Sequence, residues 1–178
     1  MLKGEDVVFS GPVFSVAIRH TQHGRRDVVV HPGAVAICAN DPTGRVLLVR
    51  QHREGARGPL WEIPAGLLER GEKPLAAAKR ELGEETGVTA GRWRYLGTIY
   101  PTPGYSTERT HLFLASDLQD TPGAHAEVDE ARFFTAEEIR HLARLGRGDA
   151  KTLAALALAG QLGSTPRSPS EEGSGTTA

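Results

Sequence analysis

With 178 residues, of which 39% are hydrophobic and 24% charged, the chain is long enough for one domain with a buried core and has an ordinary globular composition. Its formal net charge of −1 gives no overall attraction to nucleic acid or to an anionic membrane, so neither is expected as a partner. A single cysteine excludes an internal disulfide and no apolar run has transmembrane length, so we expect a cytoplasmic protein.

The first third of the chain is predicted to form strands. Residues Val13–Arg19 alternate apolar and polar side chains, and the valine-rich Asp27–His31 follows after a short turn, so a hairpin is expected. Gly33–Ala39 is nearly all apolar, which predicts a central strand buried on both faces. After a second turn, Arg45–Gln51 is expected to be the returning strand.

The rest of the chain mixes helices with strands. A polar, glycine-rich loop is expected over residues 52–59, and a helix over Pro74–Thr86, with proline in its first turn and Gly87 after its end. Further strands are predicted at Trp93–Tyr100, Thr110–Ser116 and Arg132–Thr135. Helices are predicted from Thr135, which begins a capping box, and over Lys151–Gln161. The polar tail 163–178 is expected to be disordered. This order predicts a mixed sheet covered by helices.

Three carboxylates are predicted to share one face of the helix. Glu81 and Glu85 are four residues apart, and Glu84 is three from Glu81. Unpaired like charges at this spacing repel, and a bound divalent cation would reverse that repulsion. Oxygen ligands alone favour Mg²⁺ or Mn²⁺ over zinc. The alternative is a solvated acidic helix face with Lys79 and Arg80 as its ion-pair partners.

The spacing of this segment resembles the Nudix box. Gly-x5-Glu-x7-Arg-Glu-Leu-x-Glu-Glu-x-Gly-Val is matched at every specified position from Gly66 to Val88. The resemblance implies a Nudix α/β/α sandwich with a mixed central sheet and an N-terminal β-hairpin region, in a single domain over residues 1–162. It also implies a hydrolase that uses two to three Mg²⁺ or Mn²⁺ ions.

The resemblance assigns roles to individual residues of the box. Glu81 and Glu85 match the principal metal ligands, and Glu85 is also counted among the catalytic carboxylates. Glu72 matches a supporting glutamate, and Arg80 matches an arginine that orients the helix carboxylates by ion pairing. The implied metal ligands are the backbone carbonyl of Ala65 and the side chains of Glu81, Glu84 and Glu85.

The sequences that flank the box resemble the ADP-ribose pyrophosphatase branch of the family. Residues 61–66 (WEIPAG) are similar to its E-(I/L)-P-A-G segment. Residues 102–108 (TPGYSTE) are similar to its S-P-G-F-S-D-E loop, with Thr107 in place of an acidic residue. Arg53 resembles an arginine that meets substrate phosphate, which suits its forked guanidinium. The expected substrate-binding set is Arg26, Arg53, Glu69, Thr102, Gly104 and Glu108.

The implied reaction is hydrolysis of ADP-ribose to AMP and ribose 5-phosphate by metal-activated water. A carboxylate must accept the proton of that water, and Glu127 is preferred, with Glu130 as the alternative. Either residue could equally be an ordinary acidic loop residue. Two other functions stay open: hydrolysis of another nucleoside diphosphate derivative, such as a nucleotide sugar or a dinucleoside polyphosphate, and non-catalytic binding of ADP-ribose.

The resemblance also implies a homodimer. In the ADP-ribose branch the N-terminal strands cross to the partner subunit and help to form its substrate site. Residues 1–31 are the matching region here, and they contain Arg26.

Overall fold

A computed structural model describes residues 5–121, 128 and 130–162. The predicted disordered tail, 163–178, and the candidate base Glu127 lie outside these residues. The strands are β1 (Glu5–Ser10), β2 (Ser15–Thr21), β3 (Gly24–Val30), β4 (Ala34–Ala39), β5 (Val46–Arg53), β6 (Gly58–Glu62), β7 (Ala65–Leu67), β8 (Val88–Ile99), β9 (Thr110–Asp120) and β10 (Glu130–Phe134). The helices are α1 (Pro74–Thr86), α2 (Ala136–Arg144), α3 (Ala150–Ala159) and the short 3-10 turn η1 (Glu54–Ala56).

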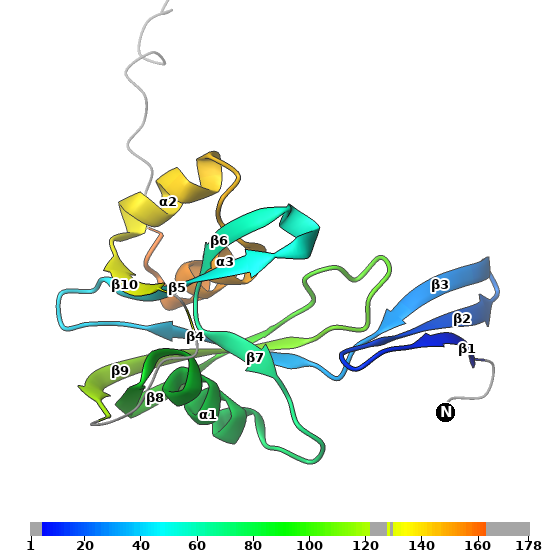
Figure 1. The fold of residues 1–178 in the computed structure, drawn as a ribbon, viewed down its shortest axis with the longest axis horizontal. Coiled ribbons are helices and arrows are strands. Elements are labelled where there is room, and N and C mark those ends of the chain that lie inside the picture. Colours follow the sequence, from blue (N-terminus) through cyan, green and yellow to red (C-terminus); the bar gives the residue numbers. More distant parts are fainter. Residues whose placement is uncertain (1–4, 122–127, 129, 163–178) are drawn as a thin grey trace, which may run out of the picture.

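The central sheet has the strand order β7-β4-β9-β8 and is mixed, as predicted. Strand β4 pairs parallel with β9, while the other pairs in this sheet are antiparallel. Helix α1 lies on one face of the sheet, and α3 and α2 lie on the other, with the smaller sheet β10-β5-β6 beside them (Figure 1). This arrangement confirms the predicted α/β/α class.

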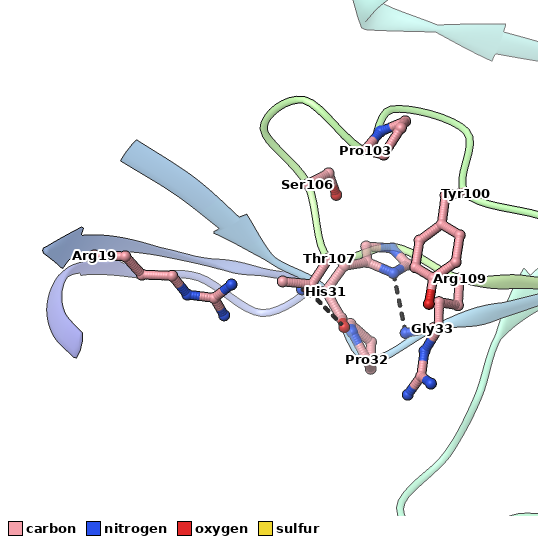
Figure 2. A pocket seen from close by; sticks show the side chains of 9 residues that line it. All are labelled: Arg19, His31, Pro32, Gly33, Tyr100, Pro103, Ser106, Thr107 and Arg109. Atoms are coloured by element: carbon pink, nitrogen blue, oxygen red, sulfur yellow. Dashed lines mark hydrogen bonds between the residues drawn. The ribbon is translucent and has the colours of Figure 1, made fainter. Parts of the chain in front are cut away.

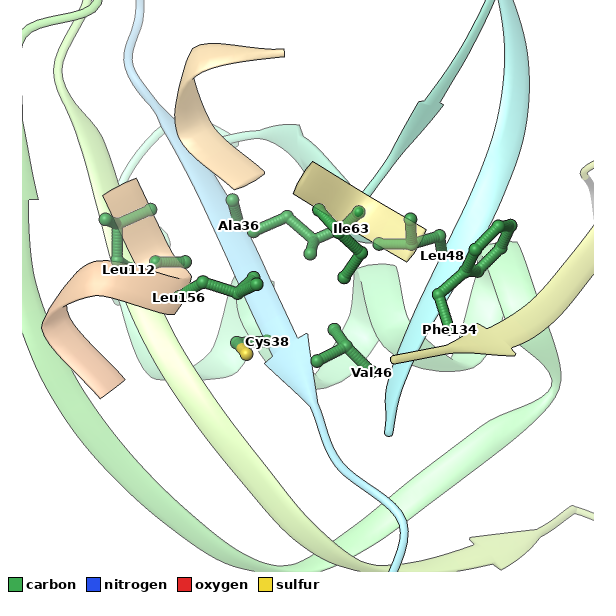
Figure 3. Packing of buried hydrophobic residues seen from close by; sticks show 10 residues of the cluster. Ala36, Cys38, Val46, Leu48, Ile63, Leu112, Phe134 and Leu156 are labelled. Atoms are coloured by element: carbon green, nitrogen blue, oxygen red, sulfur yellow. The ribbon is translucent and has the colours of Figure 1, made fainter. Parts of the chain in front are cut away.

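Strand β4 is fully buried because it contributes to two cores. Ala36 and Cys38 pack with Leu156 of α3 in one core, and the alternate residues Val35 and Ile37 pack against α1 in the other (Figure 3). Burial raises the pKa of the Cys38 thiol to about 12. The predicted central strand is therefore confirmed.

The predicted N-terminal hairpin is present, because β2 and β3 pair antiparallel. The prediction was incomplete, since Glu5–Ser10 add a third strand, β1, that the sequence analysis missed. One prediction about strand pairing was wrong. Strand β5 does not return along β4. It pairs with β6 and β10, and only an isolated bridge between Asn40 and Val46 joins the two segments.

The expected loop over residues 52–59 was also wrong. Strand β5 continues to Arg53, η1 forms the turn, and β6 already begins at Gly58, so Arg53 and Gly58 are paired across a hairpin. The polar residues here keep their strand geometry because the hairpin supplies backbone partners that a free loop would lack.

The helix ends follow the predicted capping chemistry. Pro74 starts α1, and Gly87 ends it in the left-handed region, with φ of 68°. Thr135 and Glu138 form the predicted capping box of α2. In the described part of the chain, no helix is both long and apolar enough to cross a membrane.

The N-terminal sheet extends away from the rest of the chain (Figure 1). It is joined to the loop before β9 by backbone hydrogen bonds from Val29 to Tyr105 at 2.8 Å and from Thr107 to Val29 at 2.9 Å. Several of its apolar side chains are exposed: Val7, Val8, Phe9, Val13 and Phe14.

Candidate active site on helix α1

Helix α1 presents carboxylates beside strand β7 because its other face is fixed by packing. Ala77, Ala78 and Leu82 are fully buried against the central sheet. Glu81 and Glu85, one helical turn apart, consequently lie next to the chain at β7.

Glu85 is a buried carboxylate with only neutral hydrogen-bond donors. Its side chain accepts hydrogen bonds from the backbone N–H of Ala65, at 3.0 Å, and from Nε2 of Gln51. Burial raises the pKa of Glu85 to about 7, and the neighbouring charge of Glu81 adds to this effect. The environment of the Glu85 carboxylate therefore favours the binding of a proton or a cation.

Glu81 lies directly against Gly66. A Cβ atom placed on Gly66 would be 2.0 Å from Cδ of Glu81 and about as close to both carboxylate oxygens. Burial raises the pKa of Glu81, although Arg80 opposes that effect. Glycine at the start of the Nudix box is thus required for the close approach of the carboxylate to the β7 backbone.

Arg80 holds the acidic segment together by the ion pairing that the sequence predicted. Its Nη1 donates to Glu81 at 2.7 Å and to Glu84 at 2.9 Å, while Nε and Nη2 donate to Glu72 at 3.1 and 3.0 Å. Nη2 also donates to the Leu67 carbonyl at 3.1 Å, which links α1 to β7. The hydrogen bond to Glu72 is the largest contribution to the raised pKa of Arg80.

The donor set fits a hard divalent cation. It offers carboxylate oxygens only, with two carboxyl groups whose pKa values are raised and a glycine that leaves room beside them. In the part of the chain that the structure describes, no three acidic, histidine or cysteine side chains are already arranged to hold an ion. Arg80 instead bridges Glu81 and Glu84.

A cavity of about 400 Å³ opens beside these carboxylates. Ala65 and Gly66 line it from β7, Arg53 from β5 and Glu108 from the loop before β9. The structure thus brings together three segments that the sequence analysis connected with substrate and metal.

Arg53 does not stand free in this cavity. Its Nε and Nη2 donate to the two carboxylate oxygens of Glu62 at 3.0 and 2.7 Å, and Lys151 donates to Glu62 at 2.7 Å. Burial alone would raise the pKa of Glu62, but the hydrogen bond from Arg53 and the charge of Lys151 outweigh it and lower the pKa.

Other predicted substrate residues lie outside the lining of this cavity. Arg26 is exposed on β3 of the N-terminal sheet, and Glu69 is exposed in the loop before α1. Thr102 and Gly104 belong to the loop before β9 but do not line the cavity. Glu130, the described candidate base, begins β10 with a carboxylate oxygen 3.8 Å from Arg50.

Sequence reasoning missed several contributors to the site. Gln51 binds Glu85, and His31 and Val13 line the cavity with Lys151. Only Gln51 had a signal, because it lies two residues before Arg53 and alternate strand residues share a face. Lys151 comes from a helix far along the chain, and no local pattern marks it.

The loop before β9 also lines a second cavity. Figure 2 shows that second cavity, of about 410 Å³, where Arg109 and Tyr100 lie near His31. Thr107 Oγ accepts a hydrogen bond from the His31 N–H at 2.9 Å, so the residue at the acidic position of the motif fastens the loop to the end of β3. His31 borders both cavities.

Comparison with known proteins agrees with this geometry. A sequence model of the NUDIX domain family matches residues 30–156. An ADP-ribose pyrophosphatase of Bacillus subtilis (strain 168) is 36% identical over 140 residues, covering 76% of this chain and 75% of that protein. One of Mycobacterium tuberculosis (strain ATCC 25618 / H37Rv) is 43% identical over 107 residues, 60% of this chain and 52% of that protein.

Relatives with another substrate in their names also match. A GDP-mannose pyrophosphatase of Klebsiella pneumoniae subsp. pneumoniae is 38% identical over 107 residues, 56% of this chain and 54% of that protein. The fold is similar to a crystal structure of an ADP compounds hydrolase, with a TM-score of 0.69 and 22% identity, over 89% of this chain and 91% of that one. The intact box, its helix and the matching family model lead to one conclusion: the chain belongs to the Nudix family and is a Nudix hydrolase.

Proposed function

We propose that this Nudix pyrophosphatase hydrolyses the diphosphate bond of ADP-ribose to AMP and ribose 5-phosphate, with two to three Mg²⁺ or Mn²⁺ ions. The observation that carries the proposal is the cavity in which Arg53 and Glu108 lie beside Ala65 and Gly66 of the carboxylate site. The similarity to two ADP-ribose pyrophosphatases supports the choice of substrate.

In this proposal the acidic residues of the box bind metal ions, and Arg80 orients them. Bound divalent ions would neutralise the diphosphate and activate water. Glu81, Glu85 and Glu84 would hold these ions with the Ala65 carbonyl, and Glu85 would thereby be one of the catalytic carboxylates. Arg80 keeps the carboxylates in register through its four hydrogen bonds to Glu72, Glu81 and Glu84.

Residues of the cavity and of the loop before β9 bind the substrate in this proposal. Arg53 has three N–H groups that Glu62 does not occupy, and these suit phosphate oxygens. Glu108 accepts a hydrogen bond from Thr110 at 3.1 Å and lines the cavity, where it is placed to accept hydrogen bonds from ribose hydroxyls. Glu69, Thr102 and Gly104 complete the proposed substrate set. Glu127 or Glu130 accepts the proton of the water.

The N-terminal sheet supports the proposal of a homodimer. Five exposed apolar side chains on a small sheet that extends from the domain form a surface that water disfavours. In a dimer this surface is covered, and Arg26 on the same sheet reaches the substrate of the partner subunit. The catalytic domain over residues 1–162 would then be complete only in the pair.

The experiment is a substrate panel with phosphate detection, in the presence and absence of Mg²⁺. ADP-ribose is expected to be the preferred substrate, and activity is expected to require the metal. The alternative, a pyrophosphatase of another nucleotide sugar, has its own support in the GDP-mannose relative. Comparable turnover of several sugars would refute the ADP-ribose assignment.

A matched variant tests the metal site itself. Glu85→Gln should lower kcat by about 10³-fold or more, because it removes a charged ligand from the reaction centre while keeping the shape of the side chain. The thermal midpoint should change little. Unchanged turnover in a folded Glu85→Gln protein would overturn the assignment of the metal site.

A further inference from the structure

A buried carboxylate shared by two cations lies next to the cavity. Glu62 is 2% exposed, and it accepts two hydrogen bonds from Arg53 and one from Lys151. The Oε2 oxygen of Glu62 receives both Arg53 Nη2 and Lys151 Nζ at 2.7 Å each. Both cations also line the cavity.

Lys151 occupies a position that helix energetics disfavour. It is in the first turn of α3, where the helix dipole is positive, and its side chain is only 18% exposed. The N-cap residue Asp149 compensates by accepting a hydrogen bond from Lys151 Nζ at 2.6 Å. Burial would lower the pKa of Lys151, but Asp149 and Glu62 outweigh it, so the ammonium group stays charged. A cation kept at such a site indicates a function other than stabilising the helix.

The surrounding contacts make the position of Lys151 rigid. Asp149 also accepts a hydrogen bond from the Thr152 N–H at 3.2 Å, and Thr152 Oγ accepts one from the Ile63 N–H at 3.0 Å. Ile63 follows Glu62 directly, so α3 and the end of β6 are joined on both sides of the shared carboxylate. Long cationic side chains otherwise have many rotamers, and each must be fixed before a phosphate can be bound in one geometry.

We propose that Lys151 is a positioning residue for substrate binding, which fixes Arg53 in the cavity through the Glu62 carboxylate that they share. Lys151 supplies the second positive charge on Glu62, and the carboxylate therefore stays in one orientation and holds the guanidinium of Arg53 by two parallel hydrogen bonds. The three free N–H groups of Arg53 are then presented to the anionic part of the substrate. This inference rests on the proposed function, because it gives the cavity a diphosphate ligand.

The kinetic test is a double-mutant cycle on the full chain with ADP-ribose and Mg²⁺. Lys151→Met should raise KM by about tenfold with kcat changed by less than about threefold, while Lys151→Arg should restore KM. Arg53→Lys should raise KM by itself, and adding Lys151→Met to it should have little further effect, because the two residues act as a unit. Exposed Lys79→Met is the matched control and should leave KM unchanged.

Multiplicative effects of the two substitutions would overturn the inference, and so would an unchanged KM in Lys151→Met. A second measurement does not depend on activity. The Nε–H signal of Arg53 in a ¹⁵N spectrum, assigned by its loss in Arg53→Lys, should exchange with water at least several-fold faster in Lys151→Met and slowly again in Lys151→Arg. Equal exchange in wild type and Lys151→Met would also contradict the inference.

The two proposals fail separately. If the wild type hydrolyses a different nucleoside diphosphate derivative, the substrate assignment fails and the cycle is measured with that compound. If no compound in the panel is hydrolysed, the proposed function fails and the Arg53 exchange rate alone decides on Lys151.

Discussion

At the scale of a single residue, Gly66 of β7 determines where the Glu81 carboxylate of α1 can lie. Its missing side chain is the space that the Glu81 carboxylate occupies, since an added Cβ would be 2.0 Å from Cδ of Glu81. The end of a glutamate side chain can move, so the fold can tolerate an added methyl group. The Glu81 carboxylate, however, would have to move away from its present position beside Gly66.

Gly66→Ala is therefore expected to reduce kcat by about 10²-fold, the effect of a reacting group displaced by about 1 Å, with a modest loss of stability. Gly58→Ala is the matched control, because its added Cβ would meet no atom within 4 Å. Steady-state kinetics and thermal unfolding of both variants check this. Equal kcat values in the two variants would contradict the role given to Gly66.

Glu85 makes metal binding depend on pH. Its pKa of about 7 without metal means that protons and cations compete for the same oxygens. Lowering the pH below about 7 favours the protonated, non-ligating form, so the apparent affinity for Mg²⁺ should fall by up to about tenfold per pH unit. Calorimetric titration of the metal-free protein between pH 5.5 and 8.5, in steps of about 1 unit, tests this. A flat profile would contradict it, and Glu85→Gln should remove the slope.

At the scale of the element, the Arg80 side chain links helix α1 to two neighbouring segments. Arg80 joins the helix to Glu72 in the preceding loop and to the Leu67 carbonyl of β7. The Arg80 side chain is 26% exposed, and the fork geometry of its guanidinium satisfies several acceptors at once. A lysine keeps the charge but offers no fork.

Arg80→Lys should lower the free energy of unfolding of the metal-free protein by about 1–2 kcal/mol, because hydrogen bonds between charged, partly buried groups are lost. Arg92→Lys is the control, since Arg92 is 75% exposed in its ion pair with Asp117 and its replacement should change stability much less than Arg80→Lys does. Urea unfolding measures both, and equal effects would show that burial of Arg80 is unimportant.

At the scale of the whole molecule, the N-terminal sheet extends away from the domain core, and several of its apolar side chains are exposed. Phe9 and Phe14 pack against each other, with ring centroids 6.1 Å apart, yet they stay 52% and 41% exposed. Exposed aromatic side chains grouped on one small sheet are disfavoured by water and are typical of an interaction surface. A second copy of the chain supplies one in the proposed dimer.

The double substitution Phe9→Ser with Phe14→Ser should therefore weaken dimerisation by about 10²-fold or more, because aromatic anchors dominate interfaces. Sedimentation velocity over a concentration series measures this, and KM for ADP-ribose should rise as monomer forms. Leu145→Ser, at a residue 58% exposed after α2, is the control and should stay dimeric. A monomeric wild type would refute the dimer.

Local patterns in the sequence were sufficient for much of the fold. The apolar run of β4, the spacing of α1 and the capping box of α2 each depend on neighbouring residues, and each was predicted correctly. The pairing of β5 and the third N-terminal strand were not, because strand partners are chosen by tertiary packing rather than by local propensity.

The same division holds for the site. By itself, the sequence predicted the acidic helix and the glycine before it, because the period of a helix places Glu81 and Glu85 on one face. The resemblance to the Nudix box implied a divalent metal. Only the tertiary structure decided that Gln51 binds Glu85 and that Lys151 of α3 shares Glu62 with Arg53. Gln51 is far from Glu85 in the chain, and Lys151 is far from Glu62 and Arg53, so only the packing of the two sheets with α1 and α3 brings these partners together.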